Sequence, residues 1–316
     1  MKENLNQLFD LYGFAPLHLQ AMHEDGKLLI CEEDSVSLWS LGLTPELCLR
    51  ITTSRELTDV LLSPEGSRAL LVYFHERRAE LWDLESLEIQ GNLSGCLSEG
   101  LQFDKFSNSN CGQSIFVIDD NKLNRIPWDV SGDISLTEGI KLDWEYGLGV
   151  SHFSAQPGGK EIFYIIEDEE APIRKVIREE AGEWKENIVA EMALEQVHQY
   201  ESFNFSPTGR YLCSTFRYEP VLIDTRSWEI CQSSQIFGNP IRFPLIGFSE
   251  NDQQLFWRDD TLIKSLDIAS GVVTVVVKEE WPILDFAWTR EGVYYSTLEE
   301  RVGVHLRARL RRIRLG

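Results

Sequence analysis

A short turn recurs along the chain at a nearly constant interval, and it constrains the possible folds more than any other feature. Its clearest copies read SPEG from Ser63 and SPTG from Ser206, each between two runs of alternating apolar and polar residues. Weaker copies read HEDGK, SNSNCGQ, AQPGGK, SENDQ and TREG. The copies are 40 to 50 residues apart, measured between Gly26, Gly66, Gly112, Gly159, Gly209, Asp252 and Gly292. Because tight turns between strands favour Gly, Pro, Asn and Asp, the repeat predicts a chain of similar small β-units.

A second repeated feature follows each turn by 14 to 19 residues and marks the end of a third strand. These endings read LWSLG, LWDLES, PWDVSGD, IREEAGE, LIDTRS and SLDIASG, at Trp39, Asp83, Asp129, Arg178, Asp224 and Asp267. With this period and these Trp-Asp endings, the chain resembles the WD-repeat β-propeller family across nearly its whole length. Two copies keep the Trp-Asp pair and none has the Gly-His dipeptide that usually opens the repeat, so the resemblance is to a divergent member.

The resemblance implies an all-β fold, a seven-bladed β-propeller of four-stranded antiparallel blades that forms one domain over residues 1–316. Radial stacking would bury both apolar faces of every blade. Six or eight blades, a different propeller family and an open two-sheet β-sandwich are the alternatives. The blades are expected near residues 14–53, 56–93, 99–140, 145–191, 197–236, 241–279 and 282–316, with residues 1–13 available as a ring-closing strand.

One segment, GEWKENIVAEMALEQVHQYE from Gly182, has helical rather than strand-like spacing. It predicts a short helix between the fourth and fifth blades, with one apolar face made of Ile188, Ala190, Ala193, Leu194 and Val197.

Composition indicates a folded cytoplasmic protein. A hydrophobic content of 43% over 316 residues is enough for a large core. The N-terminal sequence MKENLNQLFDLYGF lacks the apolar region and cleavage site of a signal peptide, and no apolar run approaches the 18 residues of a membrane span. The six cysteines include no C-x-x-C pair, so we expect reduced thiols that mostly fill the core.

The charge is strongly acidic except at the C-terminus. The whole chain carries a formal charge of -21, while residues 301–316 hold six arginines and no carboxylate, which leaves residues 1–300 near -27. Such a body repels phosphate backbones. We therefore expect no nucleic-acid binding except through the arginine-rich tail Arg307–Arg314.

No local motif for catalysis, cofactor binding or metal binding occurs in the sequence. There is no G-x-S-x-G, H-E-x-x-H, P-loop or complete dinucleotide fingerprint. The histidines lack the spacing of metal ligands; they are His18, His23, His75, His152, His198 and His305. We therefore expect no catalytic residue, no cofactor, no metal site and no enzymatic activity, although propeller enzymes can assemble a site from several blades.

Carboxylates gather in the loops that would join the second and third strands of each blade, on one face of the disc around the channel mouth. Aspartate in a short hairpin is explained by turn geometry alone, but the run EDEE at Glu167 is longer than a turn requires. Like charges around a channel focus the electrostatic potential on a basic partner. The predicted partner-binding residues are Glu32, Glu33, Asp34, Arg77, Arg78, Asp119, Asp120, Glu167, Asp168, Glu169, Glu170, Arg217, Tyr218, Asp259, Asp260, Glu299 and Glu300.

Three functions are compatible with these features. We favour a non-enzymatic interaction module, a rigid scaffold or assembly subunit that presents its acidic face to a basic protein, with an inhibitor or immunity-type protein as a variant. The second is a propeller enzyme or divalent-cation-binding protein with its site at the channel mouth. The third is a nucleic-acid factor that acts through the tail alone. No membrane partner is expected.

The tail itself is expected to begin as part of the fold. Val302, Val304 and Leu306 alternate as a third strand should, and Arg307 occupies the position of the repeat's aspartate. Beyond this point, either Arg311–Gly316 forms the outer strand or Leu5–Leu11 supplies it by closing the ring. We favour ring closure, which would leave the last residues as a protruding basic edge.

Overall fold

The chain folds entirely into β-strands joined by turns over the residues that the computed structural model describes. These are residues 2–4, 11–13, 18–22, 27–31, 35–40, 46–53, 57, 59–63, 65–73, 78–94, 106–108, 114–119, 122–134, 140–141, 150–157, 161–166, 173–180, 183–188, 200–216, 219–232, 246–249, 251–289, 292–302 and 305–313. None of these residues belongs to a helix long and apolar enough to cross a membrane.

Five sheets each contain four antiparallel strands that follow one another, or nearly so, along the chain. The first contains β3 (His18–Met22), β4 (Lys27–Cys31), β5 (Ser35–Ser40) and β6 (Glu46–Thr52). The second contains β11 (Phe106–Asn108), β12 (Ser114–Asp119), β13 (Lys122–Pro127) and β15 (Ile140–Lys141). The third contains β16 (Val150–Ala155), β17 (Glu161–Ile166), β18 (Ile173–Glu180) and β19 (Glu183–Ile188). The fourth contains β20 (Tyr200–Phe205), β21 (Tyr211–Phe216), β22 (Glu219–Asp224) and β23 (Glu229–Gln232). The fifth contains β24 (Ile246–Phe248), β25 (Gln254–Asp259), β26 (Leu262–Asp267) and β27 (Val273–Lys278).

Two further sheets have five strands each. One contains β7 (Asp59–Leu62), β8 (Arg68–Tyr73), β9 (Arg78–Asp83), β10 (Glu88–Ser94) and β14 (Gly132–Ile134). The other contains β28 (Ile283–Thr289), β29 (Gly292–Val302), β30 (His305–Ile313), β1 (Lys2–Asn4) and β2 (Leu11–Gly13).

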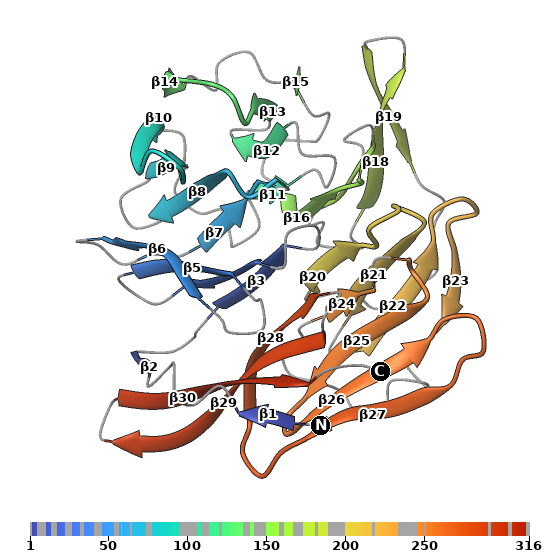
Figure 1. The fold of residues 1–316 in the computed structure, drawn as a ribbon. Helices are drawn as coiled ribbons and strands as arrows, with labels where there is room; N and C mark the ends of the chain where they lie inside the picture. The colour runs from blue at the N-terminus through green and yellow to red at the C-terminus, as the bar shows by residue number, and fades with distance from the viewer. Residues whose placement is uncertain are drawn as a thin grey trace.

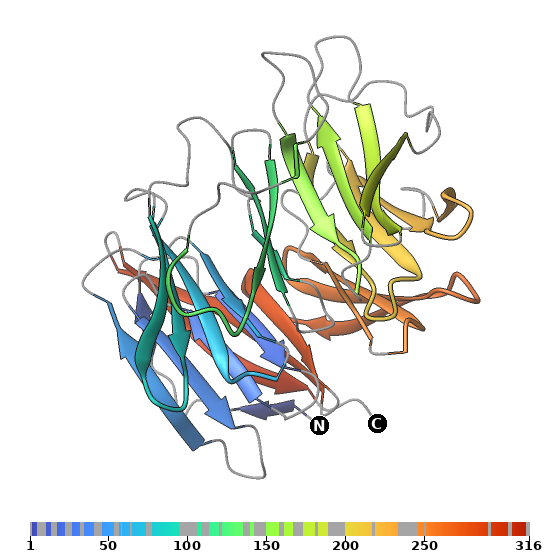
Figure 2. The same cartoon turned by 90° about the horizontal axis from the view of Figure 1, so that it is seen from above.

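The sheets form a β-propeller-like arrangement (Figures 1 and 2). The first strands of consecutive sheets lie against one another, as β7 does against β11, β11 against β16 and β16 against β20. Strand β28 of the last sheet lies against β3, which brings the end of the chain back to its beginning. The predicted all-β, propeller-like fold is therefore correct.

The prediction of seven four-stranded antiparallel blades is wrong. Five sheets of the described chain have that composition, and the other two depart from it because segments from elsewhere in the sequence join their outer edges. Local strand patterns did not reveal β14 or the exact N-terminal segments, since each added segment is only three residues long.

The first addition is β14, which pairs in parallel with β10, so that Gly91 lies opposite Gly132 and Leu93 opposite Ile134. A Cβ atom at Gly91 would lie 3.0 Å from the carbonyl oxygen of Gly132, so this approach depends on glycine. Gly132 itself has φ 87°, a conformation that residues with a side chain rarely adopt. Residues that the repeat assigned to the third blade thus complete the sheet of the second.

The second addition closes the ring. Residues Lys2–Asn4 and Leu11–Gly13 both pair antiparallel with β30, with Lys2 opposite Ile313 and Leu11 opposite Ala308. N-terminal residues therefore cover β30 at Lys2–Asn4 and Leu11–Gly13. The favoured ring closure by Leu5–Leu11 stays a prediction over residues 5–10, which lie outside the described chain.

The tail differs from the prediction in two respects. Val302 ends β29 instead of starting the next strand, because β29 runs for eleven residues and the hairpin follows it. The expected basic protrusion is also wrong for two of its arginines. Arg312 is buried and donates to the Tyr294 hydroxyl over 3.0 Å, and Arg311 pairs with Glu279 at 2.7 Å.

The predicted helix after Gly182 is wrong at its start, because Glu183–Ile188 form β19 and pair with β18 in a hairpin. Residues 189–199, which hold the rest of the predicted apolar face, lie outside the described chain.

Apolar side chains of neighbouring sheets pack face to face and form the core. Leu29 and Ile51 pack with Val60 and Leu71 across the β3–β6 and β7–β10 sheets, and equivalent clusters join other neighbours. Each sheet therefore depends on the next for burial of its faces. Among the described cysteines, Cys31 and Cys213 are buried and Cys48 and Cys231 are exposed, and all four are thiols outside any disulfide.

The repeated turns have a common hydrogen-bond pattern. The Oγ atoms of Ser63, Ser206 and Ser249 each accept from the backbone N–H five residues later, at 2.9–3.0 Å. The fourth position of each turn has a positive φ: 66° at Gly66, 74° at Gly209 and 56° at Asp252. Asp252 therefore takes the place of the glycine in its copy of the turn.

Candidate protein-binding site

Most of the predicted partner-binding residues lie outside the described chain. These are Glu32, Glu33, Asp34, Arg77, Asp120, Glu167, Asp168, Glu169, Glu170, Arg217 and Tyr218. Asp119, Glu299 and Glu300 are described by their strands, and Arg78, Asp259 and Asp260 also by their side chains. What the structure brings together is consequently one corner of the predicted acidic face.

Arg78 serves the fold of its own sheet. Its guanidinium forms an ion pair with Glu80 and donates to Asn92 Oδ1 over 3.3 Å. The buried Glu80 carboxylate also accepts from Trp82 Nε1 at 2.9 Å and from the Tyr73 hydroxyl at 3.2 Å. Its charge is thus satisfied within the sheet.

Glu299 and Glu300 belong to a strand, so the prediction that they form a loop is wrong. Both lie within β29, and Glu300 is opposite Arg307 in the β29–β30 ladder. The hairpin comes after Val302 because the ladder continues to the pair Val302–His305. The alternating pattern of the sequence did not show that β29 is longer than the second strands of the other sheets, so the hairpin was predicted too early.

Asp259 and Asp260 lie at the tip of the β25–β26 hairpin. Asp259 is paired with Leu262, which leaves Asp260 and Thr261 as a two-residue loop, and Asp260 has φ 52°. Aspartate tolerates this conformation better than most residues, so turn geometry accounts for its identity here. The Asp259 carboxylate forms an ion pair with Lys264, whereas Asp260 is exposed.

The segment that links this sheet to the next is fastened to the same hairpin. Glu279 N–H donates to the Thr261 carbonyl over 2.9 Å, and Ile283 N–H donates to the Asp260 carbonyl over 2.8 Å. Leu298 N–H donates to the Pro282 carbonyl over 2.9 Å, which fixes the segment to β29 as well. Residues 280–282 are therefore held beside the hairpin tip by backbone bonds at both ends.

Glu280 and Trp281 are the exposed residues of this fastened segment. Trp281 is 50% exposed, a large fraction for the largest apolar side chain, and Glu280 is exposed beside it. We call Asp260, Glu280 and Trp281 the Asp260 corner. Sequence reasoning missed Glu280 and Trp281 because it searched only loops between second and third strands, whereas EEWP connects two sheets.

Charged residues beneath the corner anchor it to the fold. The Arg258 guanidinium donates to the carbonyls of Ile283, over 3.3 Å, and Leu284. Burial lowers the pKa of Arg258, while the charges of Asp285 and Asp260 oppose that shift. The Glu279 carboxylate accepts from the Tyr295 hydroxyl at 2.6 Å and from Arg311 at 2.7 Å. These groups are engaged internally and leave Asp260 and Glu280 to face solvent.

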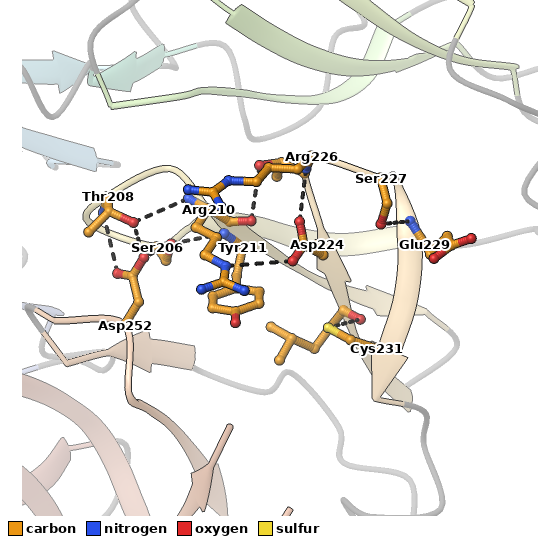
Figure 3. Close-up of polar contacts among 12 residues, drawn as sticks. Ser206, Thr208, Arg210, Tyr211, Asp224, Arg226, Ser227, Glu229, Cys231 and Asp252 are labelled. Carbon is orange, nitrogen blue, oxygen red and sulfur yellow. Dashed lines mark hydrogen bonds and ion pairs between the residues drawn. The ribbon is translucent and has the colours of Figure 1, made fainter. Parts of the chain in front are cut away.

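Carboxylates also occur on the opposite face, which the sequence analysis did not anticipate. Turns at that end of the sheets expose Glu65, Glu85 and Asp129, and Glu229 is exposed at the start of β23. Figure 3 shows how two sheets are joined there: the buried Asp252 carboxylate accepts from the hydroxyls of Ser206, at 2.8 Å, and Thr208. The acidity of the described chain is therefore not confined to the face around the Asp260 corner.

Arg210 is one of the two exposed arginines labelled in that view. It lies 5.0 Å from the centre of the Tyr211 ring and 3.6 Å from Asp224, with its side chain 47% exposed (Figure 3). A half-exposed pair of this kind contributes little to stability.

No cluster of three or more His, Cys, Asp or Glu residues that could hold a metal ion occurs in the described ranges. Comparison with known proteins gave no match, either to a protein-family model or to a curated protein.

Proposed function

We propose that this chain is a protein-interaction module that presents the Asp260 corner to a basic partner protein. The observation that carries the proposal is the half-exposed Trp281, held beside two exposed carboxylates by backbone hydrogen bonds to the hairpin tip. A rigid aromatic residue costs little conformational entropy when it is buried in an interface, and tryptophan is enriched among binding hot spots. Carboxylates around it favour Lys or Arg, which also bind well over an indole ring.

We further propose that the chain is a divergent WD-repeat propeller. In support, the aspartate that ends the third strand has the same role in three sheets. Asp83, Asp224 and Asp267 each accept backbone N–H bonds from the following turn at 2.8–2.9 Å. In each case, the residue four positions later has a positive φ. A recurring residue with a recurring local role is what descent from one repeated unit would produce.

The test of the interaction module is capture of a partner by the immobilised full chain from an extract of its source cells. Replacement Trp281→Ala should weaken capture of the specific partner by on the order of 2 kcal/mol, or roughly thirtyfold in affinity. The double replacement Asp260→Lys with Glu280→Lys should weaken it further and slow association at low salt.

Matched controls are available on the opposite face. Leu87 is 48% exposed, so Leu87→Ala removes a comparable exposed apolar group, and Glu85→Lys with Glu88→Lys makes the same change in net charge. Both controls should capture the partner normally. Equal capture by the corner variants and the controls would refute the proposal, and equal loss in both charge variants would indicate non-specific attraction.

A further inference from the structure

The outer strand of the β24–β27 sheet has an unusually apolar edge. Val272, Val273 and Val275 are 54%, 37% and 55% exposed, so three of the eight exposed large apolar side chains of the described chain lie within four residues. Strand β26 is the one partner of β27 among the described strands, which leaves the outer backbone groups of β27 facing outwards (Figure 1). Such an edge is a template for another strand.

Two other outer strands of the molecule are covered by the chain itself. Strand β14 covers β10, and β1 and β2 cover β30. This protein therefore already completes two of its sheets by pairing short segments with their outer strands. Strand β27 has the sequence VTVVVK, without proline, and its register shift at Val276 leaves Val273–Val275 in regular pairing with β26.

The charges around β27 define what could pair with it. Asp267 lies beside the start of the strand, since its N–H donates to the Val272 carbonyl over 3.0 Å. Asp260 and Glu280 lie beyond its end, where Lys278 is opposite Leu262. The five uncharged residues Val273–Val277, about 17 Å long, thus have carboxylates beyond both ends of the strand and Lys278 as its one basic residue.

We infer that β27 binds an extended segment of the basic partner by β-strand addition, an inference that rests on the proposed function. The partner's segment has alternating β-branched residues that pack on Val273 and Val275. It has a Lys or Arg at each end, one that meets Asp267 and one that meets Asp260 and Glu280. Main-chain hydrogen bonds supply affinity, and the alternating side chains and terminal charges supply specificity.

A labelled synthetic peptide, Arg-Val-Thr-Val-Thr-Val-Arg with blocked ends, tests the inference by fluorescence anisotropy against the full chain. The double replacement Val273→Lys with Val275→Lys should weaken binding about tenfold or more, because it removes the apolar contact and repels the arginines. Val273→Thr with Val275→Thr keeps β-branched residues and should retain most of the affinity. Hydrogen exchange should show new protection of the amides of residues 272–277 when the peptide is bound.

The comparison variant Leu87→Lys with Ile89→Lys adds the same charge at two other exposed apolar residues, 48% and 42% exposed. The inference would be overturned if this comparison variant weakened peptide binding as much as the β27 lysine variant does. It would also be overturned if the β27 lysine variant bound the peptide fully, or if the wild-type chain did not bind it. Undiminished binding by a peptide with central proline would also overturn it. If light scattering shows a dimer that the β27 lysine variant abolishes, a second copy occupies the edge and the inference fails. Peptide binding that depends on Trp281 alone would support the Asp260 corner and not the edge.

Discussion

Single side chains hold together the turns on which the repeat is built. The Ser206 hydroxyl is fully buried, accepts from Tyr211 N–H at 3.0 Å and donates to Asp252 of the next sheet at 2.8 Å. Ser63 makes the same bond within its turn, to Arg68 N–H at 3.0 Å. One residue type thus fixes a local turn in both places and, at Ser206, also joins two sheets.

Replacement of Ser206 by alanine should therefore lower the free energy of unfolding by about 1–3 kcal/mol, because it deprives a buried carboxylate and a backbone donor of a partner. Ser63→Ala should cost less, about 1 kcal/mol. Urea titrations followed by tryptophan fluorescence would compare the two. Equal losses of unfolding free energy in the two variants would show that the hydrogen bond from Ser206 to Asp252 does not contribute to stability.

Tyr295 should make the protein sensitive to alkali. Burial raises the pKa of this phenol above its usual value of 10, and its hydrogen bond to Glu279 adds to the effect. The folded state therefore holds the proton more tightly, so this contribution to stability is complete below pH 10 and is lost progressively as the pH rises above it. Thermal unfolding of Tyr295→Phe should show a weaker decline above pH 10 than that of the wild type. The same decline in both proteins would contradict this role.

At the scale of elements, the aspartates that end the third strands of three sheets fix the turn between the third and fourth strands. Hydrogen bonds from Ser86 and Glu85 lower the pKa of Asp83, despite the opposing effect of desolvation. A carboxyl group with a lowered pKa in the folded state contributes stability above its usual pKa, and this is lost as the pH falls.

Asp83→Ala should therefore destabilise the protein by less than about 1 kcal/mol at neutral pH, since water screens this exposed site. Asp83→Asn keeps an oxygen acceptor and should restore most of that loss while removing the acid dependence. Melting temperatures at pH 3 and pH 7 would check both variants. A loss in Asp83→Asn as large as in Asp83→Ala would count against the turn-capping role.

The β10–β14 pair should loosen selectively in Gly91→Ala. The new methyl group would lie 3.0 Å from the Gly132 carbonyl oxygen, so β14 must shift away. Hydrogen exchange at residues 132–134 should then speed up while the rest of the β7–β10 sheet stays protected. Gly247→Ala is the matched control, because its methyl group meets only the Phe286 ring at an ordinary 3.4 Å. Unchanged exchange in Gly91→Ala would contradict the need for glycine.

The elements that could be predicted from the sequence were those with local signals. The Ser-Pro-x-Gly turns predicted the first hairpins correctly, even where Asp252 replaces glycine, because positive φ and serine capping leave a residue signature. The three-residue strand β14 could not be predicted, since its partner lies about 40 residues away in another unit and it carries no alternation of its own. Ring closure was anticipated, but the sequence did not point to Lys2–Asn4 as a segment that pairs with β30. Trp281 was missed because its exposure follows from the backbone hydrogen bonds that hold residues 280–282 beside the hairpin tip. The spacing of residues in the sequence does not reveal such bonds.

At the scale of the whole molecule, stability depends on joining the chain's first and last segments. Strand β28 lies against β3, and β30 pairs with residues 2–4 and 11–13. Deletion of residues 1–13 would expose the outer edge of β30.

This deletion should lower the melting temperature by on the order of 5 °C and promote aggregation through the freed edge. Calorimetry and light scattering would measure the two effects, with Glu3→Lys as a charge control that leaves the strand in place. An unchanged melting temperature in the deletion would show that the added strands are dispensable.

The pairing of β1 and β2 with β30 also determines when the protein can finish folding during its synthesis. A ribosome adds about 5–20 residues per second, and residue 313 pairs with residue 2. Strands β1 and β2 therefore wait without their partner until β30 has been synthesised, while the sheets between them assemble in order. The nascent chain stays an open arc until residues 305–313 have emerged, and the unmatched edges of its first and last sheets are the surfaces that a chaperone would have to shield.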